Sequence, residues 1–140
     1  MARRRAGRSR IGLTIDVEVF GPLFEAGVPE HVIHDFLDET KEEVAQLGYN
    51  EVRARLGSVL KHPTGHYESR IRTERASRYN DQVITDGGVI YGNWLEGTSQ
   101  RNKTTRFKGY RVFRRIRLKL RKQVTPIAQQ NLDHYLQRLR

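Results

Sequence analysis

The histidines and carboxylates are the side chains with which this chain of 140 residues could do metal or acid–base chemistry. His31 and His34 stand three apart on a helical pattern beside acidic residues, a spacing that can bring two imidazoles to one metal. His62 and His66 flank a Pro-Thr-Gly turn, and Glu68 follows closely. Neither group has a third ligand at a fixed spacing, so we interpret both as solvated surface side chains.

Other catalytic signatures are missing from the sequence. The chain has no cysteine, which excludes disulfides, thiolate zinc sites and cysteine nucleophiles. Gly87 and Gly88 lack the glycine spacing and the lysine of a phosphate-binding loop. We therefore expect a protein that is not an enzyme and that needs no metal or cofactor. A small hydrolase or nuclease at His62, His66 and Glu68 is the weaker alternative.

The charge is large and unevenly distributed. The formal net charge is +10, yet residues 11–60 carry ten acidic and only three basic side chains. Residues 101–122 carry eleven basic and no acidic ones. This charge distribution is consistent with a polyanionic partner and equally with contact between oppositely charged patches of neighbouring copies. No apolar run is long enough to span a membrane, and no apolar segment follows the basic N-terminus, so we expect no membrane partner and synthesis in the cytoplasm.

Aromatic residues are interleaved with the basic ones in residues 101–122. Phe107, Tyr110 and Phe113 among arginines and lysines would suit stacking on single-stranded nucleic acid. On a helix, however, Tyr110 and Phe113 continue into Ile116 and Leu120, which is typical of a core stripe. We favour the core, with the arginines on the outer face, where they could meet phosphate or the acidic helix of a neighbouring copy.

Two runs within residues 79–115 resemble a known family. Val89 to Thr98 (VIYGNWLEGT) is followed by a polar loop and then by Arg106 to Arg115 (RFKGYRVFRR). This pattern resembles the tail-completion proteins of long-tailed bacteriophages, in forms from phages of actinobacteria. The resemblance implies a small α+β protein that forms a ring, usually hexameric, at the head-proximal end of the tail tube. Such a ring stops tube polymerisation and docks the tail to the head's connector.

The resemblance also implies partners and a location. The expected partners are further copies of this chain, the head-side connector or stopper protein and the tail tube protein, at the head–tail junction of the virion. Genomic DNA in the lumen remains open as a partner, as does the choice between the terminator and an adjacent neck protein. The family has a bulkier residue where Gly97 stands, and residues 101–122 are more basic than it requires. The alternative function is a non-catalytic nucleic-acid-binding protein that uses residues 101–122.

Exposure and the motif together predict the interface residues. The acidic counter-surface on the first long helix comprises Asp38, Glu39, Glu42 and Glu43. The residues expected at the subunit or partner interface are Arg70, Arg72, Glu74, Tyr91, Trp94, Leu95, Glu96, Gly97, Arg101, Lys103, Arg106, Arg114 and Arg115.

An α+β fold would position these residues. We predict a flexible basic arm over residues 1–9 and one domain over residues 10–140. Its small antiparallel or mixed sheet has about three to five strands, packed by a long N-terminal helix and a long C-terminal helix. Period-two alternation predicts a strand over 11–19, and an exposed or edge strand over 66–76 with a hairpin partner over 80–86.

The helical expectations concern five segments. A stripe from Pro29 ends at Gly48, and Asn50 caps a shorter second helix. Residues 89–96 suit a short helix or tight turn that buries two aromatic rings, and residues 97–106 suit a flexible polar loop. Residues 107–124 alternate like a strand in part, but their length favours a helix. A kink at Pro126, joining it to a final helical piece, is left open.

Overall fold

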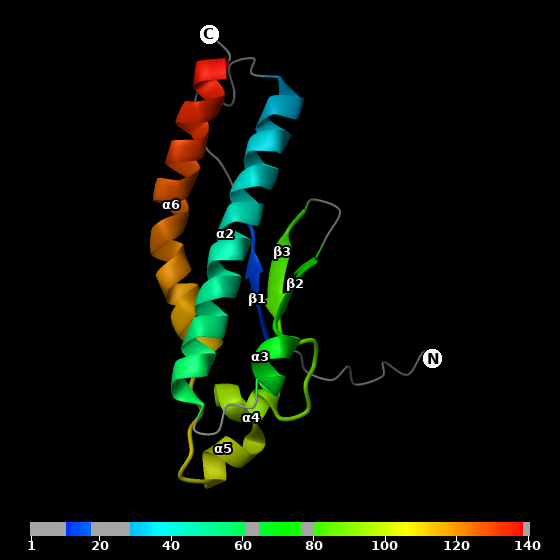
Figure 1. The fold of residues 1–140 in the computed structure, drawn as a ribbon, viewed down its shortest axis with the longest axis vertical. Coiled ribbons are helices and arrows are strands. Elements are labelled where there is room, and N and C mark those ends of the chain that lie inside the picture. Colours follow the sequence, from blue (N-terminus) through cyan, green and yellow to red (C-terminus); the bar gives the residue numbers. More distant parts are fainter. Residues whose placement is uncertain (1–10, 18–28, 61–64, 77–79, 139–140) are drawn as a thin grey trace, which may run out of the picture.

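The fold consists of one small sheet and two long helices that lie side by side (Figure 1). The computed structural model describes residues 11–17, 29–60, 65–76 and 80–138. The expected arm over residues 1–9, the end of the first predicted strand and His62 lie outside these residues. The described elements are β1 (Gly12–Ile15), α2 (Glu30–Val59), α3 (His66–Arg70), β2 (Arg72–Arg75), β3 (Gln82–Thr85), α4 (Gly92–Glu96), α5 (Gln100–Thr104) and α6 (Val112–Arg138).

The sheet is antiparallel, with β3 in the centre between β1 and β2. Leu13 pairs with Ile84, and Ile84 pairs in turn with Thr73. The predicted α+β class and the hairpin between the second and third strands are therefore confirmed. The strand expected over 66–76 is shorter than predicted, because its first five residues form α3, which turns Tyr67 into the core.

The first long helix runs through the predicted break. α2 is a single helix of 30 residues, so the expected end at Gly48 and the separate piece capped by Asn50 are wrong. Gly48 is needed there for packing: a Cβ at this position would lie 2.6 Å from Ile84 Cδ1 and 2.8 Å from Leu120 Cδ1. The glycine lets β3 and α6 approach the helix closely, and tertiary contact outweighs its weak helix propensity.

The last helix confirms the choice of helix over strand. In α6, Ile116 and Leu120 are buried, whereas Leu118 is 47% exposed. A half-buried strand would have placed all three on one face, so the period is that of a helix. The helix begins at Val112 rather than at Phe107, and it continues through Pro126 to Arg138.

The middle of the chain holds more helix than predicted. α4 confirms the short helix expected over 89–96, but Tyr91 stays 41% exposed, so the expected burial of both aromatic rings is wrong. The flexible polar loop expected over 97–106 is also wrong, because it contains α5 with a complete capping box. Ser99 accepts the N–H of Arg101, and the side chain of Asn102 accepts the N–H of Ser99.

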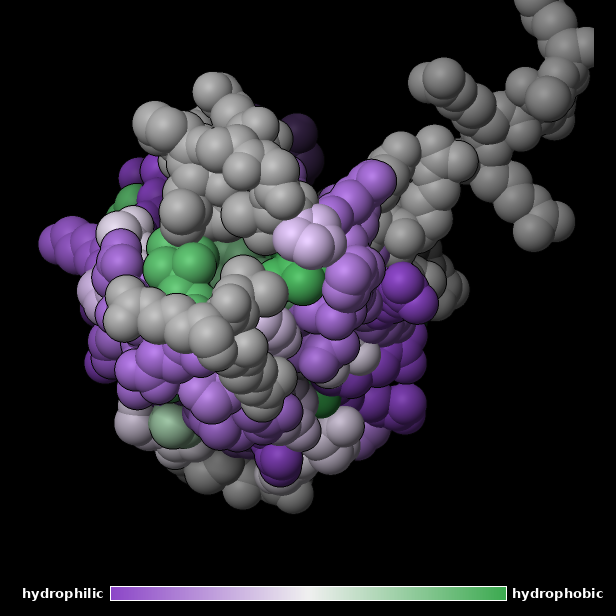
Figure 2. Space-filling model, turned by 90° about the horizontal axis from the view of Figure 1, so that it is seen from above, coloured by the Kyte–Doolittle hydropathy of each residue, from purple (hydrophilic) through white to green (hydrophobic). Residues whose placement is uncertain are grey.

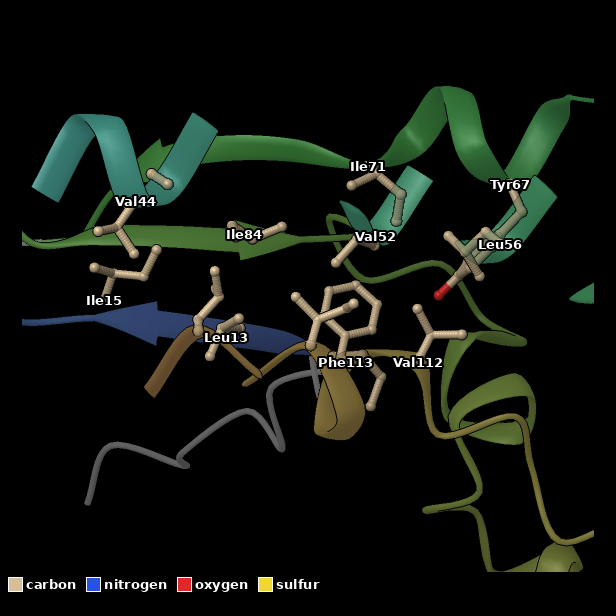
Figure 3. Close-up of a cluster of buried hydrophobic side chains, with 14 of the residues drawn as sticks. Leu13, Ile15, Val44, Val52, Leu56, Tyr67, Ile71, Ile84, Val112 and Phe113 are labelled. Carbon is tan, nitrogen blue, oxygen red and sulfur yellow. The ribbon is translucent and has the colours of Figure 1, made fainter. Parts of the chain in front are cut away.

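The core lies between the sheet and the two long helices (Figure 3). Ile84, Val44 and Val52 are completely buried, and Phe113 from α6 closes the cluster from the other side. A 30-residue helix is about 45 Å long, whereas a four-residue strand spans about 13 Å. The helix pair therefore extends well beyond the sheet, as Figure 1 shows.

α2 and α6 run antiparallel. Near the start of α2, the ring of Phe36 meets that of Tyr135 edge-on at 6.0 Å. Near its end, Glu51 Oε1 pairs with Lys119 Nζ at 2.8 Å. The first half of each helix thus lies beside the second half of the other. Within the described ranges, no helix has both the length and the apolar character that a membrane crossing requires.

Candidate functional site

The two runs that carry the resemblance form one structural unit at the lower end of the molecule in Figure 1. We call residues 92–113 the α4–α5 unit. Asn102 lies buried at its centre, and its Nδ2 donates to the carbonyl oxygens of Trp94 and Phe107, each at 3.1 Å. The Lys108 ammonium donates to the carbonyl of Asn102 at 2.8 Å. One amide side chain thus ties both runs together across the intervening helix.

Two glycines allow the backbones of the two runs to touch. Gly97 has φ 101° and Gly109 has φ 91°, a region that favours glycine. A Cβ on Gly97 would lie 2.1 Å from the carbonyl oxygen of Lys108. Beside this contact the N–H of Tyr110 donates to the carbonyl of Leu95 at 2.7 Å. The contact explains why a glycine follows Glu96 in this chain.

Glu96 caps the C-terminal helix. Its two carboxylate oxygens accept the backbone N–H groups of Phe113 and Arg114, each at 3.1 Å. These N–H groups belong to the first turn of α6, which has no intrahelical acceptor for them and favours a negative charge. Burial raises the pKa of the Glu96 carboxyl above its ordinary value, and the two N–H donors oppose that rise.

Three aromatic rings contact one another in the α4–α5 unit in tilted and edge-on arrangements. The ring centroids of Trp94 and Phe107 are 5.0 Å apart, and those of Phe107 and Tyr110 are also 5.0 Å apart. The Arg101 guanidinium lies 5.3 Å from the centroid of the Trp94 ring. The rings are partly buried against one another, so the interleaved aromatics of the basic segment serve packing within the chain, as the core interpretation expected.

A second buried polar contact joins this unit to the sheet. The Tyr67 hydroxyl donates to Asp86 Oδ2 at 3.0 Å, and the N–H of Gly88 donates to Asp86 Oδ1 at 2.8 Å. A Cβ on Gly92 would lie 2.0 Å from Asp86 Oδ2, so α4 begins directly on this carboxylate. Burial, followed by the Asp86 charge, raises the pKa of Tyr67 well above its ordinary value. At neutral pH the hydroxyl keeps its proton and donates it.

The surface around the unit has two hollows. The first, about 310 Å³, lies where β1 begins and α6 starts, and Arg111, Arg114 and Arg117 line it together with Glu96. The second, about 480 Å³, lies between α3 and residues 86–91, which precede α4. Its lining includes Ile90, which is 80% exposed, together with Tyr91, Arg70 and Arg72, which the sequence placed at an interface.

The predicted interface residues fall into two groups. The first group is exposed, as a contact surface requires, and comprises Tyr91 and the basic residues at positions 70, 72, 101, 103, 106, 114 and 115. Glu74 is half-buried, and its Oε1 lies 2.6 Å from Arg72 Nε. Trp94, Leu95 and Gly97 are half-buried, and Glu96 is 7% exposed. The motif core therefore works inside the chain, and the surface around it is basic.

The acidic counter-surface occupies the other end of the helix pair. Asp38 is half-buried, and Glu39, Glu42 and Glu43 are exposed. Glu43 Oε2 already accepts a hydrogen bond from Asn131 at 2.9 Å, and Glu42 Oε1 accepts one from Asn80 at 3.3 Å. Figure 2 looks onto this end, where the described surface is mostly hydrophilic.

Because α2 and α6 are antiparallel, charge is separated along the long axis. Residues 30–43, with six acidic side chains and one lysine, lie beside the nearly neutral second half of α6. The eleven basic residues of 101–122 lie at the opposite end. Lys41 is the exception within the acidic half: it is buried, with Nζ 3.0 Å from Asp81 Oδ1.

The histidine clusters do not assemble into a metal site in the described part of the chain. There, no group of three or more histidine or acidic side chains is arranged to hold a metal ion. His31 and His34 are exposed, and His34 Nε2 lies 3.4 Å from Glu30 Oε1.

The predicted interface list lacks Asp86, and it also lacks Asn102, Gly109, Arg111 and Arg117, which the alternative site at residues 101–122 includes. Ser99-x-x-Asn102 was a readable signal, since it has the spacing of a capping box. Comparison with models of known protein families, with curated proteins and with solved structures finds no match to this chain.

Proposed function

We propose that this chain is a structural virion protein of the phage head–tail neck, and that it acts as the tail terminator. In this role six copies form a ring that caps the tail tube and docks it to the head connector. The proposal rests on the resemblance of residues 79–115, and it includes no catalysis.

The observation that carries the proposal is the way the two resembling runs are joined. Glu96 and Gly97 from the first run contact Phe113 and Gly109 from the second through a helix cap and a backbone contact. Residues that sequence comparison alone would treat as two short motifs thus form one rigid unit. Such a unit, built of small helices with exposed charged side chains, is suited to present a fixed surface to a partner.

The charge separation limits how copies can meet. A ring requires heterologous contacts, in which one patch meets a different patch of the next copy. Copies standing side by side in register would bring like charges together, because the acidic and basic residues lie at opposite ends of each helix pair. Attraction between Glu39 and Arg115 of neighbouring copies therefore requires an offset along the long axis.

The first test is the mass of the assembly in solution. Light scattering after size-exclusion chromatography is expected to give either the 16.3 kDa of one chain or about 98 kDa, six times that mass. Adding purified tail tube protein is expected to convert a monomer into the ring. A chain that stays monomeric with tubes present, or that mass spectrometry fails to find in purified virions, would refute the proposal.

The second test addresses the contact itself. Glu39→Lys and Arg115→Glu are each expected to weaken assembly, and the double variant is expected to restore it if the two residues meet across the interface. Arg75→Glu serves as the charge-matched control, because Arg75 is exposed on the edge strand β2 and is not among the residues predicted at either surface. Assembly that responds equally to all three single changes would indicate net charge rather than a specific contact.

The basic end favours a second candidate function, non-catalytic nucleic-acid binding through residues 101–122. Nearly all of the basic side chains there are exposed, and the only acidic side chain in residues 92–122 is the buried Glu96. A surface of one sign, with its counter-charges at the far end of the molecule, attracts polyanions.

A further inference from the structure

The first hollow gathers three arginines whose charge the chain leaves largely uncompensated. Arg111, Arg114 and Arg117 follow each other at intervals of three, so they line neighbouring turns of α6 and its entry. Within the described ranges none of the three guanidinium groups makes an ion pair with a carboxylate. The hollow itself measures about 310 Å³, roughly ten times the 30 Å³ that a water molecule takes in the liquid.

Glu96 modifies the site without cancelling it. Its carboxylate lines the same hollow, but both of its oxygens accept N–H groups from the first turn of α6. The helix terminus is thereby occupied, so attraction for an anion comes from the guanidinium groups and not from the backbone. Three positive charges against one negative charge leave a net positive charge that attracts an anionic group.

We propose that this hollow binds one phosphate group of a nucleic-acid backbone. Guanidinium groups suit phosphate because their planar N–H donors can engage two oxygens at once. Thr98 also lines the hollow, with its hydroxyl donating to Asn93 Oδ1 at 2.9 Å, and Gly12 leaves one wall without a side chain. The inference rests on the second candidate function, nucleic-acid binding, and does not depend on the ring.

The neighbouring surface favours nucleic acid over a single protein carboxylate. By helical spacing Arg121 lies on the same side of α6 as Arg114 and Arg117, and Arg115 and Lys122 form a second row on the other side of Leu118. These side chains are exposed. A carboxylate would be satisfied by the hollow alone, whereas a strand of phosphates extends beyond it and uses the further rows.

Three acidic residues of this chain already have partners within it. Glu51 pairs with Lys119, and Glu42 and Glu43 accept hydrogen bonds from asparagines of their own chain. Recognition of a phosphate backbone carries no sequence information, so we expect binding that depends on salt and not on base sequence.

Fluorescence anisotropy with a labelled 20-base-pair duplex of arbitrary sequence tests the proposal. The test variant is Arg111→Gln/Arg114→Gln/Arg117→Gln in the full chain. The matched control is Arg53→Gln/Arg55→Gln/Arg75→Gln, which removes the same number of charges from exposed positions outside the hollow. We expect the test variant to bind about tenfold more weakly and to lower the slope of log K against log salt by roughly 0.9, the value for one phosphate contact. The control is expected to keep the slope.

Three different negative results of this experiment would lead to three different conclusions. If the intact chain binds no duplex at low salt, the second candidate function fails. If the chain binds but the test variant and the control behave alike, the function stands and the hollow is refuted as its site. A third result would overturn the proposal in favour of contact between copies. In that case a peptide of residues 35–43 binds the intact chain but not the test variant, and the duplex binds neither protein.

Two further measurements guard the result. Circular dichroism and thermal melting check that both triple variants are folded. If the test variant does not fold, the single substitution Arg117→Gln within α6 replaces it. Inorganic phosphate provides an independent probe: in ¹⁵N-resolved NMR it is expected to shift the amides of Gly12 and Thr98 in the wild type. Shifts of equal size in Arg117→Gln would contradict the site.

Discussion

The contact between Gly97 and Gly109 yields a prediction that separates steric from conformational effects. In Gly97→Ala the new methyl group would meet the carbonyl oxygen of Lys108 at 2.1 Å, and it would do so at φ 101°. A non-glycine residue in this region costs about 1–2 kcal/mol. The obstacle is backbone, which cannot turn aside as a side chain can.

Relief of the clash requires the two runs to separate. That movement breaks the hydrogen bond from Tyr110 N–H to the carbonyl of Leu95 and leaves two polar groups without partners, which costs about 1–3 kcal/mol. Together with the φ penalty, we expect Gly97→Ala to lower the free energy of unfolding by about 2–5 kcal/mol. That is a large fraction of the 5–15 kcal/mol typical of a domain.

Two other glycines serve as matched controls. Gly57→Ala lies in α2 with nothing within 4 Å of the new carbon, so alanine's helix propensity should raise stability by up to about 1 kcal/mol. Gly65→Ala meets nothing within 4 Å but has φ 78°, so it should show the conformational cost alone, about 1–2 kcal/mol.

Urea denaturation provides the measurement. Circular dichroism reports the long helices, and fluorescence of Trp94, the single tryptophan, reports the α4–α5 unit. The expected order of stability is Gly57→Ala, wild type, Gly65→Ala and Gly97→Ala. Equal losses for Gly65→Ala and Gly97→Ala would refute the reasoning, because they would show that the backbone contact yields without cost.

Three further predictions concern buried groups. Because burial raises the folded-state pKa of Glu96, stability should fall as pH rises from its ordinary value of 4.5 through that raised pKa, and Glu96→Gln should lack this component in pH-dependent melting. Lys41→Ala should cost about 3–5 kcal/mol, since it removes the buried cation that pairs with the carboxylate of Asp81; a much smaller loss in Lys41→Met, which lacks the charge but keeps an apolar stem, would show that charge is not the cause. Leu120→Ala should cost about 2–5 kcal/mol and Leu118→Ala less than about 0.5 kcal/mol by denaturant titration, and the reverse order would contradict the orientation of α6.

The spacing of apolar residues was sufficient to predict the type of secondary structure where one face of a helix or strand is buried. The alternation of Leu13 and Ile15 reads as a strand because only one side of the sheet is packed. The spacing of Phe113, Ile116 and Leu120 likewise reads as a helix. These patterns reflect local geometry and burial, which a sequence carries directly.

Local signals failed where distant residues decide the outcome. Gly48 has the appearance of a helix end, yet Ile84 and Leu120 fill the space that a side chain would take. Residues 97–106 have the composition of a loop, yet Asn102 finds acceptors on both sides of α5. For Gly48 the determining partners are remote in sequence, and for Asn102 they belong to the segments on either side of α5.

The sequence by itself determined the amounts of charge and their order along the chain: an acidic segment first and a basic segment last. The tertiary structure decided where those charges lie. The antiparallel packing of α2 and α6 puts the acidic half of one helix beside the neutral half of the other, so opposite charges stand at opposite ends instead of neutralising each other. It likewise turned Glu96 inward to cap α6 and brought Arg111, Arg114 and Arg117 to one hollow. The physical reason is that burial of the apolar stripes determines how the helices pack. The charged side chains lie on the opposite faces, so the packing also fixes where they are.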